Sequence, residues 1–273
     1  MDGRRRTQTA DGGRGLLFAG AMVVAATAAF FPTPSSSVLY RLLPSPHSDI
    51  HSEYVKYLSG KDTITAYLAY PERPDPAPAV IVIHDIYGLG DRLRPAVERL
   101  ARSGYVAIGP DLLSRGGGTP QVPDSARRLI VALNPDTLTR DLDATYAYVR
   151  GLKAVRRDRI GVIGFCWGGS QSFRYATNNP SLQAFVVCYG QGPDTSALAR
   201  IKAPGLGVYA ENDSRIDAGL TDLTPALKRA GVDYHYTVYP GVGHAFLQQT
   251  DKPQVADSAW AAIMAFFHQK LER

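Results

Sequence analysis

Six short runs of β-branched and aromatic residues constrain the fold of this chain more than any other feature of its sequence. Each run is almost free of polar interruptions, which is typical of strands that are covered on both faces of a sheet. The runs cover residues 80–83, 105–108, 160–163, 185–187, 206–209 and 236–239. Between them, residues 93–101, 223–227 and 257–271 carry apolar side chains at helical spacing. Strands that alternate with helices predict an α/β fold with a mostly parallel, doubly wound sheet.

An antiparallel hairpin is expected at the N-terminal edge of this sheet. Residues 54–58 and 63–70 flank a Ser-Gly-Lys-Asp sequence, and the second segment alternates between apolar and polar side chains. The preceding residues 32–50 are rich in Pro and Ser and are interpreted as a linker. A chain of 273 residues has room for one large α/β domain, which we expect over residues 51–273.

Residues 1–31 have the layout of an export signal. A basic start is followed by an uncharged stretch over residues 15–31, and Ala26-Thr27-Ala28 offers a small-residue cleavage site. This stretch of 17 residues is shorter than the roughly 20 that span a membrane, and it is rich in Ala and Gly. We expect a cleaved signal peptide and a periplasmic or secreted protein. A retained membrane anchor, with transient membrane contact through this leader, is the alternative.

The charge balance and the cysteine count exclude several classes of protein. The formal net charge is +5, but four arginines lie within the first fourteen residues. Other basic residues, such as Arg92 and Arg94, are expected on a solvated helix surface, which argues against nucleic-acid binding. Two cysteines cannot form a disulfide framework. His47 lies beside Pro46 in the linker and His51 at the start of the domain, not on a helix, so no metal site is expected. Without a phosphate or dinucleotide motif, no cofactor is expected.

The sequence Gly-Phe-Cys-Trp-Gly-Gly at residues 164–169 has the pattern of a nucleophile elbow, with Cys166 in place of the usual serine. It follows an expected strand and precedes an expected helix over residues 170–176. A side chain at position 164 or 168 would collide with neighbouring backbone in so tight a turn. The N-terminus of the following helix favours the thiolate over the thiol. We therefore predict Cys166 as the nucleophile; a buried structural cysteine is the alternative.

Two further candidates follow strands downstream of the elbow. A triad in the α/β-hydrolase fold has the order nucleophile, acid, histidine, and the chain supplies Asp213 and His244 in that order. His244 is predicted to act as the base, while Asp213 fixes its tautomer and stabilises the imidazolium. Glu211 and Asp217 are rivals for the acid, although Asp217 is expected to cap the next helix.

Two backbone amides complete the predicted arrangement. An oxyanion hole takes one N–H from the residue after the nucleophile, Trp167, and one from the loop after the third strand, for which Ile86 is expected. That loop has the sequence His84-Asp85-Ile86-Tyr87-Gly88. Together with the elbow and the acid and histidine loops, it resembles the dienelactone hydrolase family over roughly residues 52–271. The leader and this loop together resemble an exported branch of that family.

The resemblance implies roles for further residues. A carboxylate at the place of Asp85, Glu in the family, contacts the resting cysteine and takes part in activating it; a loop-capping role is the alternative. An arginine at the place of Arg115 binds the substrate carboxylate, and the alternative is a solvated loop charge. The family's second carboxylate-binding arginine corresponds to Gln248, which favours a neutral or different ester. His84 is interpreted as structural.

Cys188 and Tyr189 follow the strand expected beside the elbow. Cys188 is interpreted as a small apolar core residue, because a disulfide to Cys166 would silence the nucleophile. A redox-regulated pair of cysteines is the alternative. Tyr189 is expected to line the substrate pocket.

The sequence thus predicts a hydrolase that cleaves a lactone or carboxylic ester through a Cys-His-Asp triad and a thioester acyl-enzyme. We expect a monomer with a small-molecule ester or lactone substrate. One alternative is a broad-specificity carboxylesterase that acts on neutral or polymeric esters outside the cytoplasm. Another is a binding protein that has this fold without its chemistry.

Overall fold

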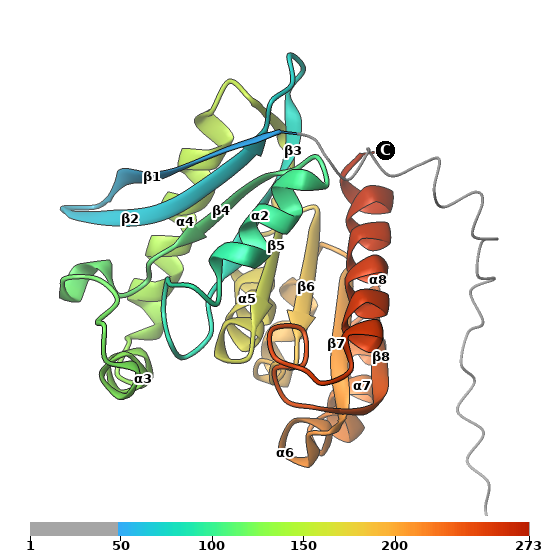
Figure 1. Ribbon diagram of the computed structural model, residues 1–273. Helices are drawn as coiled ribbons and strands as arrows, with labels where there is room; N and C mark the ends of the chain where they lie inside the picture. The colour runs from blue at the N-terminus through green and yellow to red at the C-terminus, as the bar shows by residue number, and fades with distance from the viewer. Residues whose placement is uncertain (1–48, 273) are drawn as a thin grey trace, which may run out of the picture. The chain divides into compact units, whose positions relative to one another are not determined.

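The computed structural model describes residues 49–272. Their strands form a single eight-stranded sheet (Figure 1). The strand order is β1-β2-β4-β3-β5-β6-β7-β8. Only the β1/β2 and β2/β4 pairs are antiparallel; the others are parallel. The strands are β1 (Ile50–Ser59), β2 (Asp62–Pro71), β3 (Ala77–Ile83), β4 (Val106–Pro110), β5 (Val155–Phe165), β6 (Ala184–Cys188), β7 (Gly205–Asn212) and β8 (Tyr234–Gly243). The predicted parallel sheet and its N-terminal hairpin are confirmed.

Helices cover both faces of the sheet. Those of the described part are α2 (Arg94–Arg102), α3 (Pro123–Val131), α4 (Pro135–Gly151), α5 (Trp167–Asn178), α6 (Ser214–Asp217), α7 (Leu220–Arg229) and α8 (Pro253–Leu271), with 3-10 turns η1 (Ser114–Gly116) and η2 (Thr195–Arg200). Buried residues of α2 and α8 share one core, and those of α4, α5 and α7 share the other. Ile81 and Ile83 of β3 point into the second core, whereas Val80 and Val82 point into the first. Apolar side chains on both faces explain why the strands appear as uninterrupted apolar runs.

The stretch after β4 is more helical than the sequence analysis expected. No helix was predicted between residues 108 and 160, whereas the chain there forms η1, a short loop and α3. Helix α4 was not predicted. Its start is set by Asn134, whose side chain accepts hydrogen bonds from the amides of Asp136 and Thr137.

The predicted leader and nearly all of the predicted linker lie outside the described residues. Ile50, which the sequence analysis assigned to the linker, already pairs with Pro71 as the first residue of β1. Among the helices of residues 49–272, none has the length and apolar composition needed to cross a membrane.

Candidate active site

Cys166 occupies the turn between β5 and α5 in a strained conformation, with φ of 57° and ψ of −117°. A Cβ on Gly164 would lie 1.9 Å from the carbonyl oxygen of Gly168, and a Cβ on Gly168 would lie 2.3 Å from that of His84. The prediction that both positions exclude a side chain is confirmed. Close backbone packing therefore fixes the turn that holds the sulfur at the carboxyl ends of the strands.

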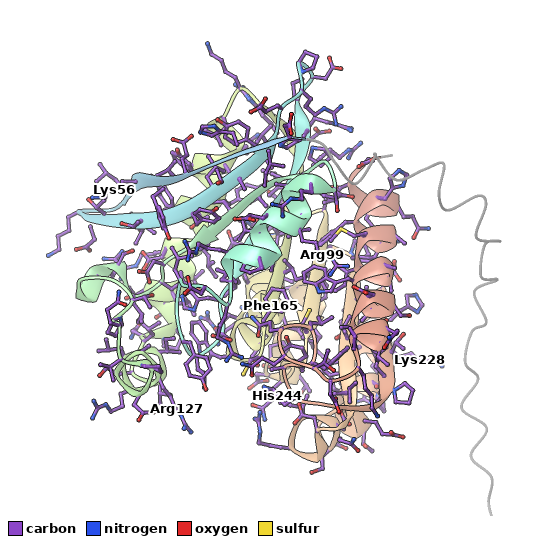
Figure 2. All side chains as sticks on the ribbon, viewed as in Figure 1. Lys56, Arg99, Arg127, Phe165, Lys228 and His244 are labelled. Carbon is purple, nitrogen blue, oxygen red and sulfur yellow. The ribbon has the colours of Figure 1, made fainter. Side chains whose placement is uncertain are left out.

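His244 and Asp213 converge on Cys166 from two other loops. Asp213 directly follows β7, and His244 directly follows β8 in the loop that leads to α8 (Figure 2). The Nε2 atom of His244 lies 3.0 Å from the Sγ atom of Cys166. On the opposite side of the ring, Nδ1 is hydrogen-bonded to Oδ2 of the buried Asp213. One ring nitrogen thus faces the sulfur and the other faces a carboxylate, which is the arrangement that activates a thiol.

The contacts of His244 raise its pKa above the ordinary value. The hydrogen bond with Cys166 is the largest cause and the hydrogen bond with Asp213 adds to it, while partial burial of the ring opposes both. The imidazole therefore keeps its second proton to a higher pH than an ordinary histidine. A positive ring 3.0 Å from the sulfur favours the thiolate, the nucleophilic form of cysteine.

The amides of Ile86 and Trp167 are available to a ligand, since neither donates a hydrogen bond to another residue within 49–272. His84 fixes the peptide that contains the first of them. The Leu112 amide donates to Nε2 of His84 (3.2 Å), so the ring carries its proton on Nδ1 and donates it to the Asp85 carbonyl (2.8 Å). Because the C=O and N–H of a trans peptide point in opposite directions, this bond also sets the direction of the Ile86 N–H. Burial lowers the pKa of His84, which keeps the ring neutral.

Asp85 is buried beside the site but does not contact Cys166. One carboxylate oxygen accepts a hydrogen bond from the Tyr87 amide (2.8 Å), and the other lies 3.3 Å from Nε of Arg92. No hydrogen bond joins this carboxylate to the sulfur in the described part of the chain, where the sulfur contacts His244 instead. The contact that the resemblance implied is therefore absent, and the short side chain caps its own loop.

The sequence matches the model of the dienelactone hydrolase family over residues 64–271. The chain belongs to this family. A relative from Methylorubrum extorquens, named as a carboxymethylenebutenolidase, is 33% identical over 223 residues, which cover 76% of this chain and 77% of the relative. A second relative with this name, from Escherichia coli K12, is 31% identical over 259 residues, which cover 88% of this chain and 94% of the relative. A dienelactone hydrolase structure from Klebsiella pneumoniae has a TM-score of 0.74 at 28% identity and covers 81% of this chain and 99% of that one. The protein is accordingly a hydrolase with the α/β-hydrolase fold of the dienelactone hydrolases.

Arg115 does not have the position that its match to the dienelactone hydrolases implied. Its guanidinium binds the buried Asp141 through Nε and Nη2, Asp62 through Nη1, and the carbonyl of Ser59 through Nη2. All three nitrogens are occupied at the end of the β1–β2 hairpin. Arg115 therefore ties this hairpin to α4, and the expectation that it binds substrate is wrong for this arrangement.

Arg92 is the functional candidate that the sequence analysis missed. It was assigned to a solvated helix surface, but α2 begins only at Arg94, and Arg92 lies in the preceding loop with its guanidinium carbon 4.7 Å from the centre of the Tyr87 ring. Its side chain is 31% exposed and reaches the buried Asp85. The one available signal was its place in the loop after β3, because loops at the carboxyl ends of strands form the ligand site in open α/β sheets.

Tyr189 and Cys188 lie beneath the site. The Tyr189 ring is fully buried and packs edge-on against the His244 ring, with centroids 5.1 Å apart. The expectation that Tyr189 lines the substrate pocket is therefore wrong, because its enclosed ring supports the imidazole from within the core. Cys188 is fully buried in the core, and both it and Cys166 are free thiols. Burial raises the pKa of Cys188 and disfavours its thiolate, as expected for the core residue that the sequence analysis preferred.

The two rival acids do not reach His244 in the described structure. Glu211 accepts a hydrogen bond from the Gly241 amide (2.8 Å). Asp217 ends α6, so the expectation that it would cap the next helix is wrong; α7 begins at Leu220 instead. Burial and the nearby Asp213 raise the pKa of Asp217.

Potential metal ligands do not gather in this part of the chain. Within residues 49–272, no group of three or more His, Cys, Asp or Glu side chains could hold a metal ion.

Proposed function

We propose that this protein hydrolyses a carboxylic ester or lactone by nucleophilic catalysis, with Cys166, His244 and Asp213 as its triad. The observation that carries the proposal is the 3.0 Å separation between Sγ of Cys166 and Nε2 of His244, with Asp213 on the opposite ring nitrogen. The family's hydrolases and the relatives named as carboxymethylenebutenolidases support the same class of substrate.

In the first step, the thiolate of Cys166 attacks the carbonyl carbon, and the amides of Ile86 and Trp167 hold the oxygen that becomes negative. The carbon–oxygen bond of the ester then breaks. His244 gives its proton to the leaving alkoxide, or to the enolate of an opened lactone. The product of this half-reaction is a thioester between the acyl group and Cys166.

In the second step, neutral His244 takes a proton from water as the water attacks the thioester. The carbon–sulfur bond of the thioester then breaks and the acid is released. The sulfur of Cys166 returns to its ion pair with the imidazolium of His244. Asp213 retains its charge and holds the ring in one orientation throughout.

The sequence pattern of residues 1–31 adds a second part to the proposal: an enzyme exported from the cytoplasm. Fractionation of cells that express the full chain, with an N-terminal sequence of the recovered protein, tests this part. Recovery of the uncleaved chain from the cytoplasm refutes it.

Three proteins test the catalytic proposal: the wild type, Cys166→Ala and Cys188→Ala. Each is assayed with p-nitrophenyl acetate and a dienelactone. We expect Cys166→Ala to lose at least about 10³-fold in kcat, and Cys188→Ala to retain most activity because its sulfur is enclosed in the core. Equal turnover by the wild type and Cys166→Ala contradicts the proposal. Inactivity of all three proteins toward every ester favours a binding protein instead.

A further inference from the structure

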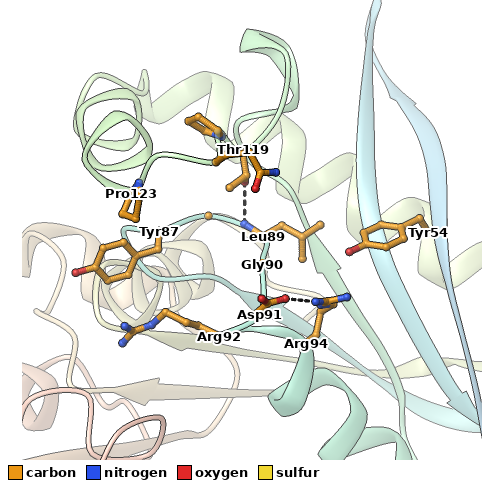
Figure 3. Close-up of a pocket in the computed structure, with 12 residues that line it drawn as sticks. Tyr54, Tyr87, Leu89, Gly90, Asp91, Arg92, Arg94, Thr119 and Pro123 are labelled. Atoms are coloured by element: carbon orange, nitrogen blue, oxygen red, sulfur yellow. Dashed lines mark hydrogen bonds and ion pairs between the residues drawn. The ribbon is translucent and has the colours of Figure 1, made fainter.

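A cavity of about 640 Å³ adjoins the loop that contains Ile86. It is lined by the loop at residues 87–94, by residues 119–123, and by Tyr54 of β1. Figure 3 shows Tyr87 and Tyr54 on opposite sides of this cavity, with Arg92 and Arg94 between them and Thr119 facing them. Its volume is within the range of small-molecule sites.

The cavity and the candidate active site share one loop. Tyr87 lines the cavity, and its amide is bound to the buried carboxylate of Asp85, the residue before Ile86. Arg92 lines the cavity and reaches the same carboxylate with its Nε atom. The lining of the cavity therefore begins at the residue that follows Ile86, whose amide is one of the two proposed oxyanion donors.

Both arginines of the cavity are ion-paired, but through different atoms: Arg94 through a terminal nitrogen, Nη2, and Arg92 through Nε. Arg94 forms a hydrogen-bonded ion pair with Asp91. The Nε atom of Arg92 is buried and faces Asp85 at 3.3 Å, but without the geometry of a hydrogen bond. Its Nη1 and Nη2 atoms donate to no other residue among those that the structure describes. A guanidinium with free terminal N–H groups pairs best with a carboxylate, which it can bind through two parallel hydrogen bonds.

The walls of the cavity are aromatic. The Tyr87 and Tyr54 side chains are exposed, and the Arg92 guanidinium lies over one face of the Tyr87 ring. Rings that are held in this way offer flat contact surfaces to a planar group.

We propose that this cavity binds the part of the substrate that is remote from the ester bond, and that this part is an aromatic ring with a carboxylate. Arg92 pairs with the carboxylate, and Tyr87 contacts the ring. The inference rests on the proposed function and adds the chemistry of the substrate to it. In the sequence analysis, Gln248 in place of an arginine favoured a neutral ester. The present proposal favours an anionic ester instead, because Arg92 supplies the missing cation from a different loop.

The test compares 4-carboxyphenyl acetate with 4-carbamoylphenyl acetate, its neutral analogue of nearly the same shape. We expect the wild type to favour the carboxylate ester by about tenfold in kcat/KM, the size of effect expected of one charge-assisted hydrogen bond. Arg92→Gln should bring this ratio close to one. Arg94→Gln is the matched control and should keep it, because Asp91 already binds a terminal nitrogen of Arg94, so that Arg94 cannot offer both of them to a carboxylate. Loss of Arg92 can also disturb Asp85 and so change the turnover of both esters. The ratio of their kcat/KM values is unaffected by such a shared change.

Each result decides one of the two proposals. Equal turnover of both esters by the wild type overturns the inference about the cavity, as does a preference that survives in Arg92→Gln or disappears in Arg94→Gln. The proposed function survives these results if Cys166→Ala is inactive. Turnover of both esters by Cys166→Ala at the rate of the wild type refutes the proposed function.

Discussion

Replacement of Gly168 by alanine tests how closely the elbow depends on backbone packing. The added Cβ would lie 2.3 Å from the carbonyl oxygen of His84 and 2.5 Å from that of Ile83, where ordinary contact begins at 3.4 Å. Both atoms belong to the backbone of fully buried residues, Ile83 at the end of β3 and His84 directly after it, so the backbone has to move by roughly 1 Å. Overpacking of this kind costs about 1–3 kcal/mol of stability. The same shift moves the Ile86 amide, and a displacement of this size can lower kcat by about 10²-fold.

Gly151→Ala is the matched control, because a Cβ there meets no atom within 4 Å at the last residue of α4. Urea unfolding gives the stability of both variants, and p-nitrophenyl acetate turnover gives kcat. We expect the control to match the wild type in both quantities, or to be slightly more stable. If Gly168→Ala also matched the wild type in both, the packing argument for the elbow would be refuted.

Substitutions at three other residues test the remaining assignments. Asp213→Asn removes one of the contacts that raise the pKa of His244, so the alkaline limb of kcat/KM against pH should move to lower pH; an unmoved limb contradicts the assigned ion pair. Arg115→Ala leaves the buried Asp141 without its cation, so the free energy of unfolding should fall by about 3 kcal/mol while KM stays constant. A higher KM at unchanged stability would restore its role in substrate binding. His84→Leu should lower kcat by about tenfold, and His84→Gln should restore part of the loss; full activity of His84→Leu would show that the oxyanion loop needs no such support.

The strands and the triad candidates could be predicted because their signals are local. Cys166, Asp213 and His244 each directly follow a strand that is visible as an apolar run. The carboxyl ends of parallel strands share one edge of the sheet, so residues 78 positions apart come into contact there. The glycines around Cys166 were equally informative, since only a tight strand-to-helix turn requires them.

Helix α4 was missed because its buried face is partly polar. Asp141 and Thr145 interrupt the apolar stripe, and both are buried with partners from other elements. Arg115 binds Asp141, and the Tyr57 hydroxyl is hydrogen-bonded to Thr145 (2.7 Å). Hydrophobic periodicity cannot register such pairs, because the partner that compensates each polar group lies elsewhere in the chain.

The roles of the arginines could not be predicted for the same reason. Arg115 and Arg92 both lie in segments that follow strands, Arg115 in η1 after β4 and Arg92 in the loop after β3. Tertiary packing gives the first a buried carboxylate from α4 and the second a buried carboxylate at the site. Similarity to a family pattern assigned the substrate role to Arg115, whereas, of these two arginines, it is Arg92 whose terminal N–H groups have no partner within residues 49–272.

The most direct test of the account is the detection of the acyl-enzyme itself. The protein is mixed with an excess of p-nitrophenyl acetate, quenched in acid within milliseconds to seconds, and analysed by intact mass and peptide mapping. We predict an added acetyl group on the peptide that contains Cys166, removed by hydroxylamine as a thioester, and absent from Cys166→Ala. Turnover without any acyl group on Cys166, or with an acyl group on another residue, would contradict the account.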